Sequence, residues 1–104
     1  MMCGKAAIVE QLLPEVKNYL NITWDDEAED RKVSGFIADA MFYLDDKAGE
    51  ECDYIEPGYP RTLLMEHCRY HRDSALDVFE TNYRAQILAM QNNEKVKRYV
   101  EKTV

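Results

Sequence analysis

The stretch between Pro60 and Gln91 constrains the fold most, because it contains no further Gly or Pro and its mainly apolar residues recur at steps of three or four. This spacing follows one face of an α-helix, and the residues are Leu64, Cys68, His71, Ala75, Phe79, Tyr83, Ile87 and Met90. Pro60 suits the first helical position, where its missing N–H is not needed. The pattern predicts a helix over residues 60–91, either straight or bent near Thr81 and Asn82, whose side chains compete for backbone hydrogen bonds.

A straight helix over this stretch would be roughly 48 Å long at about 1.5 Å per residue, which exceeds the width of a compact domain of this size. We therefore expect its second half to project as an assembly surface rather than belong to the core. Exposed apolar surface of this kind usually marks an interface. The predicted subunit or partner interface combines the end of the apolar stripe with the basic residues after it: Phe79, Tyr83, Ile87, Met90, Lys95, Lys97 and Arg98.

A shorter helix is expected near residues 14–20. Pro14 disfavours a helical conformation at Leu13, so the sequence predicts that this helix begins at the proline. Asn21 can end it in the left-handed conformation. Residues 1–12 show only a weak helical pattern, and we expect them to be either flexible or ordered only on assembly.

The next helix is predicted over residues 24–48. Thr23 as N-cap with Asp26 three residues later approximates a capping box, and the acidic residues that follow place negative charge at the positive end of the helix dipole. Gly49 ends the helix. Gly35 inside it costs roughly 1 kcal/mol relative to Ala. With small residues nearby, Gly35 predicts close approach of another helix, from the same chain or from a neighbouring subunit.

These elements predict an all-α fold, a small antiparallel bundle with one long C-terminal helix, in a single domain of residues 1–104. A loop over residues 50–59 joins the second helix to the third. Residues 92–104 fit no period cleanly and, like the N-terminus, are expected to be flexible or ordered only on assembly. The predicted core contains Val16, Leu20, Phe36, Ile37, Ala40, Leu44, Leu64, Cys68 and Ala75.

The charge of the chain is negative and uneven. The formal net charge of −7 argues against nucleic acid as a bound partner, because phosphates bind to clustered basic surfaces. Residues 1–93 hold nine basic and eighteen acidic side chains, whereas residues 94–104 hold four basic and two acidic ones. The sequence therefore predicts an acidic body, which does not exclude DNA that passes nearby without being bound, followed by a tail of opposite charge.

Membrane contact and disulfides are not expected. No apolar run approaches the roughly 20 residues that span a bilayer, and charged residues interrupt the N-terminus where a signal peptide would be apolar. The cysteines, Cys3, Cys52 and Cys68, have neither the number nor the spacing of a disulfide framework. The sequence predicts an intracellular protein, in which Cys68 is a small apolar core residue.

Residues 67–71 contain a cluster with metal-ligand spacing, since two histidines at i and i+4 share a helical face. A small metal-binding enzyme using His67, Cys68 and His71 is one interpretation. The stretch lacks the Glu of the zinc-protease motif and a second pair of ligands, with only Cys52 as an outside candidate. We expect both histidines to be half-buried polar residues of a helix interface, and we predict no catalytic residue, metal or cofactor.

The order of the elements carries a resemblance. A short helix is followed by an acidic cap at residues 24–30, an amphipathic helix closed by Ala48 and Gly49, and a loop that contains proline. The most specific piece is residues 72–84, which read ArgAspSerAlaLeuAspValPheGluThrAsnTyrArg. Residues 14–91 resemble the head-to-tail connector (adaptor) proteins of long-tailed bacteriophages and related prophages.

The resemblance implies a structural protein of the virion neck, assembled in the host cytoplasm, that forms a ring of about a dozen copies beneath the portal protein. Such a ring extends the DNA channel, through which DNA passes without specific binding, and offers a platform for a head-completion or tail protein. The family brings no catalytic residues. The alternative is a small helical protein-binding or regulatory module that acts as a dimer or heterodimer.

Overall fold

The computed structural model describes residues 2–103, except for the side chains of residues 2–4, 98 and 101–103. Within this range the chain forms five α-helices and one 3₁₀ turn, and no strand. The elements are α1 (Met2–Tyr19), α2 (Glu27–Ala48), α3 (Tyr59–Arg72), the 3₁₀ turn η1 (Leu76–Val78), α4 (Phe79–Asn82) and α5 (Arg84–Thr103). The predicted all-α class is confirmed.

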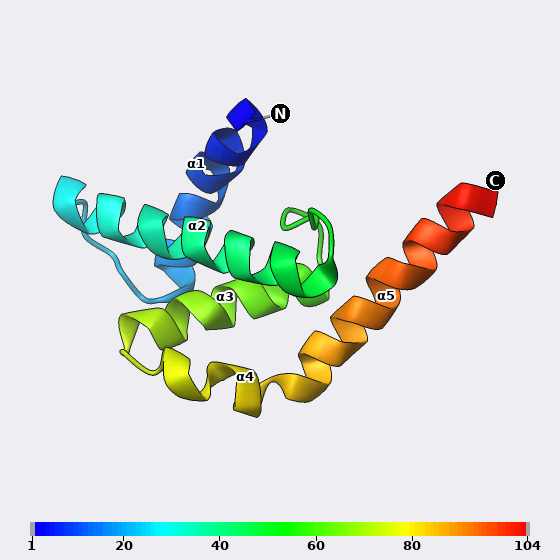
Figure 1. Ribbon diagram of the computed structural model, residues 1–104. Coiled ribbons are helices and arrows are strands. Elements are labelled where there is room, and N and C mark those ends of the chain that lie inside the picture. Colours follow the sequence, from blue (N-terminus) through cyan, green and yellow to red (C-terminus); the bar gives the residue numbers. More distant parts are fainter. Residues whose placement is uncertain (1, 104) are drawn as a thin grey trace.

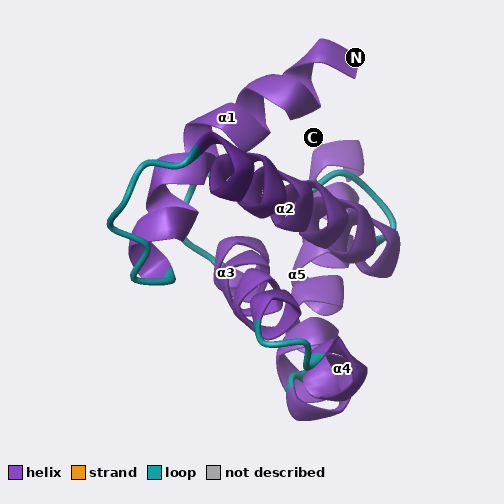
Figure 2. Cartoon of the chain, turned by 90° about the vertical axis from the view of Figure 1, so that its left-hand side faces the viewer, coloured by secondary structure: helices purple, strands orange, loops and turns teal. Residues whose placement is uncertain are grey.

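The α2–α3 pair forms the centre of the molecule. These two helices lie side by side and run in opposite directions (Figure 1). α1 crosses the pair on one side and α5 on the other (Figures 1 and 2), and both contact α2 and α3. α5 continues past the body, so its C-terminal end stands apart from the other helices (Figure 1). The views thus show the predicted antiparallel arrangement for α2 and α3 alone.

The first helix is longer than the sequence suggests. α1 begins at Met2 and passes through Pro14, so the prediction that this helix starts at the proline is wrong. A proline inside a helix costs roughly 3 kcal/mol, and an apolar face that continues on both sides of it offsets that cost. Leu12 and Val16 on this face are fully buried. Residues 2–12, predicted to be flexible or ordered only on assembly, are helical.

The caps of α1 and α2 depend on neighbouring residues, and most of them are as the sequence predicts. Asp26 rather than the predicted Thr23 is the N-cap of α2, and its carboxylate accepts a hydrogen bond from the Ala28 N–H at 3.0 Å. The helix therefore begins three residues later than predicted. Asn21, with φ 63°, and Gly49, with φ 81°, both take the left-handed conformation predicted for them.

The predicted continuous helix over residues 60–91 is wrong, because α3 ends at Arg72 and the chain reverses. Ser74 has a left-handed conformation with φ 56°. The N–H of Ala75 donates to the carbonyl of Tyr70 at 2.8 Å, and the N–H of Ser74 donates to the carbonyl of His71 at 3.1 Å. This is the Schellman pattern, which ends a helix and redirects the chain.

A second break, at Tyr83, separates α4 from α5. The bend predicted near Thr81 and Asn82 lies beside it. η1 and α4 turn the chain so that the first part of α5 packs back on α2 and α3 (Figures 1 and 2). Residues 92–103, predicted to be flexible or ordered only on assembly, continue α5 as helix.

The core forms where α1, α2, α3 and α5 meet. Most of the predicted core residues are buried, namely Val16, Phe36, Ile37, Ala40, Leu44, Leu64 and Cys68. Leu20 and Ala75 are only half-buried, the latter because it lies in the turn after α3. Gly35 is exposed, and nothing lies within 4 Å of the place a Cβ would occupy. The predicted approach of a helix from the same chain to Gly35 is therefore wrong, which leaves the neighbouring-subunit alternative.

Ser74→Gly should stabilise the fold. A left-handed conformation costs a residue with a Cβ about 1–2 kcal/mol, more than the roughly 0.5–1 kcal/mol that glycine loses in conformational entropy. We expect the free energy of unfolding in urea to rise by about 0.5–1 kcal/mol. Asp73→Gly is the matched control, because Asp73 has φ −87° and should lose stability. Equal losses in both variants would contradict the expectation.

Candidate functional site

The apolar residues of the predicted interface face inward. Phe79 is 1% exposed, Ile87 and Met90 are also buried, and Tyr83 is half-buried. The prediction that this stripe is an assembly surface rather than core is therefore wrong for Phe79, Ile87 and Met90. The physical reason is the turn at Ser74, which returns the stripe to α2 and α3 instead of letting it project.

An aromatic cluster holds Phe79 in place, and its members are Tyr43, His67, Tyr70, Phe79 and Tyr83. The ring of Phe79 makes edge contacts with His67 and Tyr70, at centroid distances of 5.0 and 5.5 Å. It stacks on Tyr83 at 5.0 Å and meets the edge of Tyr43 at 6.0 Å. Such pairs contribute about 0.5–1.5 kcal/mol each beyond the burial of area. The first residue of α4 thus fixes this four-residue helix on α2 and α3.

A carboxylate on α4 adds a polar tie to α2. Glu80 accepts a hydrogen bond from the Tyr43 hydroxyl at 2.5 Å, and the Lys47 Nζ lies 2.9 Å from the same oxygen. The hydrogen bond from Tyr43, followed by that from Lys47, lowers the pKa of the Glu80 carboxyl. Gln91 joins α5 to α2 as well, because its side-chain amide donates to the carbonyl of Lys47 at 2.8 Å.

Glu66 ties the start of α5 to α3. Its buried carboxylate accepts hydrogen bonds at 2.5 Å from the Tyr83 hydroxyl and from the Arg69 guanidinium. Burial would raise the pKa of Glu66, but the hydrogen bonds from Arg69 and Tyr83 together outweigh it and lower the pKa. Glu66 is therefore ionised at neutral pH and anchors the residue that separates α4 from α5.

His67 and His71 lie one turn apart on α3 and pack against rings of α2. His67 meets Tyr43 at a centroid distance of 5.1 Å, and His71 meets Phe36 at 4.3 Å. The Nδ1 atoms of both histidines are buried without a hydrogen-bond partner among the described residues. Burial, reinforced by His71, lowers the pKa of His67 to about 4 against an opposing effect of Asp39. The prediction of a half-buried histidine holds for His71, whereas His67 is buried.

The cysteines and histidines do not converge on a site in the described part of the chain. No group of three or more His, Cys, Asp or Glu side chains there could hold a metal ion. Burial raises the pKa of the Cys52 and Cys68 thiols to about 12. Both thiols are therefore protonated at neutral pH.

α5 has a second apolar face, opposite the one that Ile87 and Met90 bury. Its large side chains are exposed, and with their exposed fractions they are Leu88 (53%), Val96 (61%), Tyr99 (70%) and Val100 (50%). At 3.6 residues per turn they fall within about 120° of the helix surface. We call this set the exposed α5 face. A helix with apolar residues on two faces usually has a partner for each.

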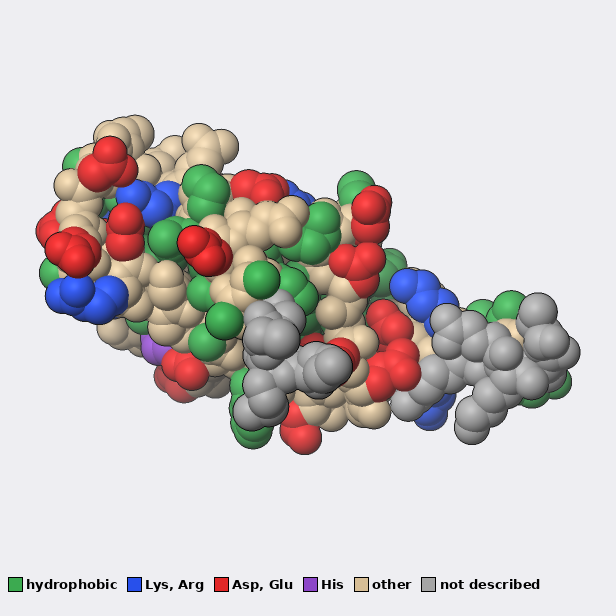
Figure 3. Space-filling model, turned by 90° about the horizontal axis from the view of Figure 1, so that it is seen from above, with side chains coloured by type: hydrophobic (Ala, Val, Ile, Leu, Met, Phe, Trp, Pro, Cys, Tyr) green, Lys and Arg blue, Asp and Glu red, His purple; other side chains and the backbone are tan. Residues whose placement is uncertain are grey.

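Basic side chains accompany the exposed α5 face. Lys95 and Lys97 are exposed, whereas the side chain of Arg98 lies outside the described residues. The Lys97 Nζ lies 4.0 Å from the carboxylate of Glu94. Figure 3 shows basic side chains where the projecting end leaves the body, next to acidic side chains on the body itself. That these lysines take part in an interface stays a prediction.

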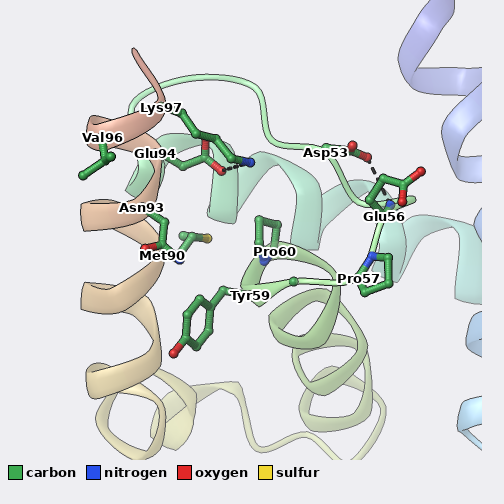
Figure 4. Close-up of a pocket in the computed structure, with 11 residues that line it drawn as sticks. Asp53, Glu56, Pro57, Tyr59, Pro60, Met90, Asn93, Glu94, Val96 and Lys97 are labelled. Atoms are coloured by element: carbon green, nitrogen blue, oxygen red, sulfur yellow. Dashed lines mark hydrogen bonds and ion pairs between the residues drawn. The ribbon is translucent and has the colours of Figure 1, made fainter. Parts of the chain in front are cut away.

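A groove of about 400 Å³ lies between the α2–α3 loop and α5 (Figure 4). Asp53 and Glu56 line its loop side, and Glu94 and Lys97 line its α5 side. The Asp53 carboxylate accepts a hydrogen bond from the Glu56 N–H at 3.3 Å, so it is engaged within its own loop. The described lining contains no Ser, Cys or His, and its charged side chains are Asp53, Glu56, Glu94 and Lys97.

Comparisons of this chain with protein-family models, with curated proteins and with solved structures found no match. No helix in the described part of the chain is both long and apolar enough to cross a bilayer. Function is therefore inferred from the surfaces of the molecule and from the resemblance carried by residues 14–91.

The sequence alone does not predict the exposed α5 face. Val96, Tyr99 and Val100 have the i, i+3, i+4 spacing of one helical face, but three residues are a short signal, and Asn92 resembles the end of a helix because of its weak helix propensity. Joined to Leu88 across that asparagine, the three residues follow one helical face. This helical spacing can be recognised only when it is known that the helix continues through Asn92.

Ile87→Ala and Leu88→Ala should separate the two faces of α5. Ile87 is buried, so its truncation should lower the free energy of unfolding by about 2–5 kcal/mol. Leu88 is exposed, and its truncation should change that free energy by no more than about 0.5 kcal/mol. Urea unfolding of the two variants measures the difference. Similar losses for both neighbours would contradict the burial of one face.

The free energy of unfolding should fall as pH drops from 7 to 5. His67 has an ordinary pKa near 6.5 in the unfolded chain and a pKa of about 4 in the fold. The unfolded chain therefore takes up a proton first, which costs about 2 kcal/mol by pH 5. His67→Phe should remove most of this slope in urea titrations at the two pH values. An unchanged slope would assign the effect to other groups.

Proposed function

We propose that this chain is a head-to-tail connector of a long-tailed phage or prophage, a structural protein that forms a ring below the portal. The resemblance of residues 14–91, most specific at 72–84, supports this proposal. The observation that carries it is the exposed α5 face, a row of large apolar side chains on a helix that extends beyond the body.

Leu88 and Val96 of the exposed α5 face support assembly, because both are exposed on the side of the helix that faces away from the body. Ile87 and Met90 hold the opposite side of α5 on the body, so the exposed side points away from the core of its own chain. Large apolar patches of this kind usually mark contacts with other proteins. When such a patch meets a different surface on the next copy, repetition of the contact produces a ring if the rotation closes.

The charge distribution supports a channel through which DNA passes. Residues 1–93 carry twice as many acidic as basic side chains, and an acidic surface repels the phosphate backbone. In this proposal DNA moves through the ring without specific binding. The basic end of α5 docks on an oppositely charged partner, which is the portal protein, a neighbouring subunit, or a head-completion or tail protein.

The proposal relocates the interface on α5. Phe79, Ile87 and Met90, predicted from sequence to meet a neighbour, hold the helix on its own body instead. Leu88 and Val96 on the opposite side, with Lys95 beside them, take over the role of contact residues. The basic part of the predicted interface is kept.

Electron microscopy of the protein mixed with the portal protein of the same phage or prophage tests this function. We expect rings of about a dozen copies stacked on the portal. The double variant Leu88→Ser, Val96→Ser should keep the far-ultraviolet circular dichroism of the wild type and form no ring. Val78→Ser is the matched control, because Val78 is an exposed apolar residue outside α5, and this variant should assemble normally.

Other outcomes would change the conclusion. A discrete dimer, with or without the portal protein, would contradict the connector role and favour the helical protein-binding module. Rings formed by the double variant would place the subunit contact away from α5.

A further inference from the structure

The outer side of α2 is the second exposed helical surface of the molecule. Phe42 at its centre is 77% exposed, and Gly35, Ala38, Asp39 and Asp46 around it are exposed as well. These positions recur at steps of three or four and lie opposite the residues that α2 buries in the core. We call this set the outer α2 face.

The outer α2 face combines two small residues with a protruding ring. Open space lies where Gly35 would carry a Cβ, and Ala38 adds only a methyl group one turn further on. Small residues allow a second helix to approach closely, while Phe42 offers a large apolar contact beside them. No helix of the same chain uses this surface in the described residues, since both α1 and α3 pack on the buried side of α2.

Charge distinguishes the two exposed helical surfaces. Asp39 and Asp46 make the second half of the outer α2 face acidic, and the negative end of the helix dipole lies at the same end, before Gly49. Lys95 is exposed and lies two turns after Leu88 on the same side of α5, whereas Lys97 lies on the side that lines the groove. Attraction between these surfaces favours contact of α5 with α2, and repulsion disfavours contact of either surface with itself.

We propose that the exposed α5 face of one copy packs on the outer α2 face of the next copy. Leu88 and Val96 lie against Gly35 and Phe42, and Lys95 faces the acidic half of α2. This inference specifies the subunit contact of the proposed ring and so rests on that proposed function.

A second copy of this chain is the occupant that the geometry favours. α5 packs on its own body through Ile87 and Met90, so its exposed side cannot also reach the outer α2 face of the same molecule. The two surfaces are different, and every copy carries both. Each copy therefore binds one neighbour through α5 and another through α2, which is the head-to-tail arrangement that generates rings.

Cysteine cross-linking of the full chain tests the contact. Ala38→Cys and Asn92→Cys, exposed positions beside the contact residues on the two faces, are combined with Cys3→Ser and Cys52→Ser, so that Phe42, Leu88 and Val96 stay in place, while the fully buried Cys68 is retained. A short bismaleimide should produce a ladder of dimers, trimers and higher multimers, because each copy carries both halves of the contact. A contact of identical surfaces across a two-fold axis would stop at dimers and would overturn the proposal.

Two controls accompany the ladder. Glu10→Cys, an exposed position on α1, replaces Ala38→Cys and should lower the yield of multimers several-fold. Equal yields would overturn the contact. Lys95→Glu should reduce the ladder by about two- to five-fold, the range of an exposed ion pair. Adding Asp39→Lys and Asp46→Lys to that chain should restore the ladder, and failure to do so would reject the charge pairing.

The same samples mixed with the portal protein separate this contact from the connector role. A ladder without any ring on the portal supports the contact and rejects the connector. Rings on the portal without cross-links between positions 38 and 92 support the connector and reject the contact. If neither ladder nor ring forms, both proposals fail.

Discussion

The burial of Phe79 between α2 and α3 determines where the C-terminal half of the chain lies. α4 has four residues, too few for a helix that is stable by itself, so it depends on the aromatic cluster around its first residue. The turn at Ser74 brings Phe79 to that cluster, and the hydrogen bond from Tyr83 to Glu66 sets where α5 begins. Once α5 is held by one side, its opposite side must face outward, and the exposed α5 face is the consequence.

Acidic residues accept several of the hydrogen bonds that join one element of the fold to another. In three pairs a tyrosine hydroxyl donates to a carboxylate at 2.5 or 2.6 Å, and the pairs are Tyr43 with Glu80, Tyr54 with Asp45, and Tyr83 with Glu66. Asp45 also accepts hydrogen bonds from the Cys52 N–H at 3.0 Å and the Lys5 Nζ at 2.6 Å, which fixes the loop after α2. The negative charge of the chain is thus partly structural, because each pair joins one element to another.

Features set by neighbouring residues could be predicted from the sequence, and features set by distant packing could not. Asn21 and Gly49 end helices through their own tolerance of the left-handed conformation. Ser74 also ends a helix in the left-handed conformation, although serine does not favour that conformation. The helical spacing of apolar residues continues through Ser74, so periodicity alone does not reveal the turn. The helix continues through Pro14 because apolar residues on both sides of it are buried in the core. The candidate surface was misassigned for the same reason, since Phe79 is buried by helices that lie far away in sequence.

The attachment of α5 through its first half makes the rest of this helix a lever. Ile87, Met90 and Gln91 hold α5 on the body. The residues from 95 to 103 extend about 13 Å beyond these contacts, so a rotation of about 10° there moves the far end by about 2 Å. The orientation of the projecting end is therefore controlled by the contacts of the first half of α5. In the proposed ring, small changes in the interior of one copy would be amplified at its tip, and neighbouring copies with slightly different contacts at the base of this end could reach positions that are not related by perfect rotational symmetry.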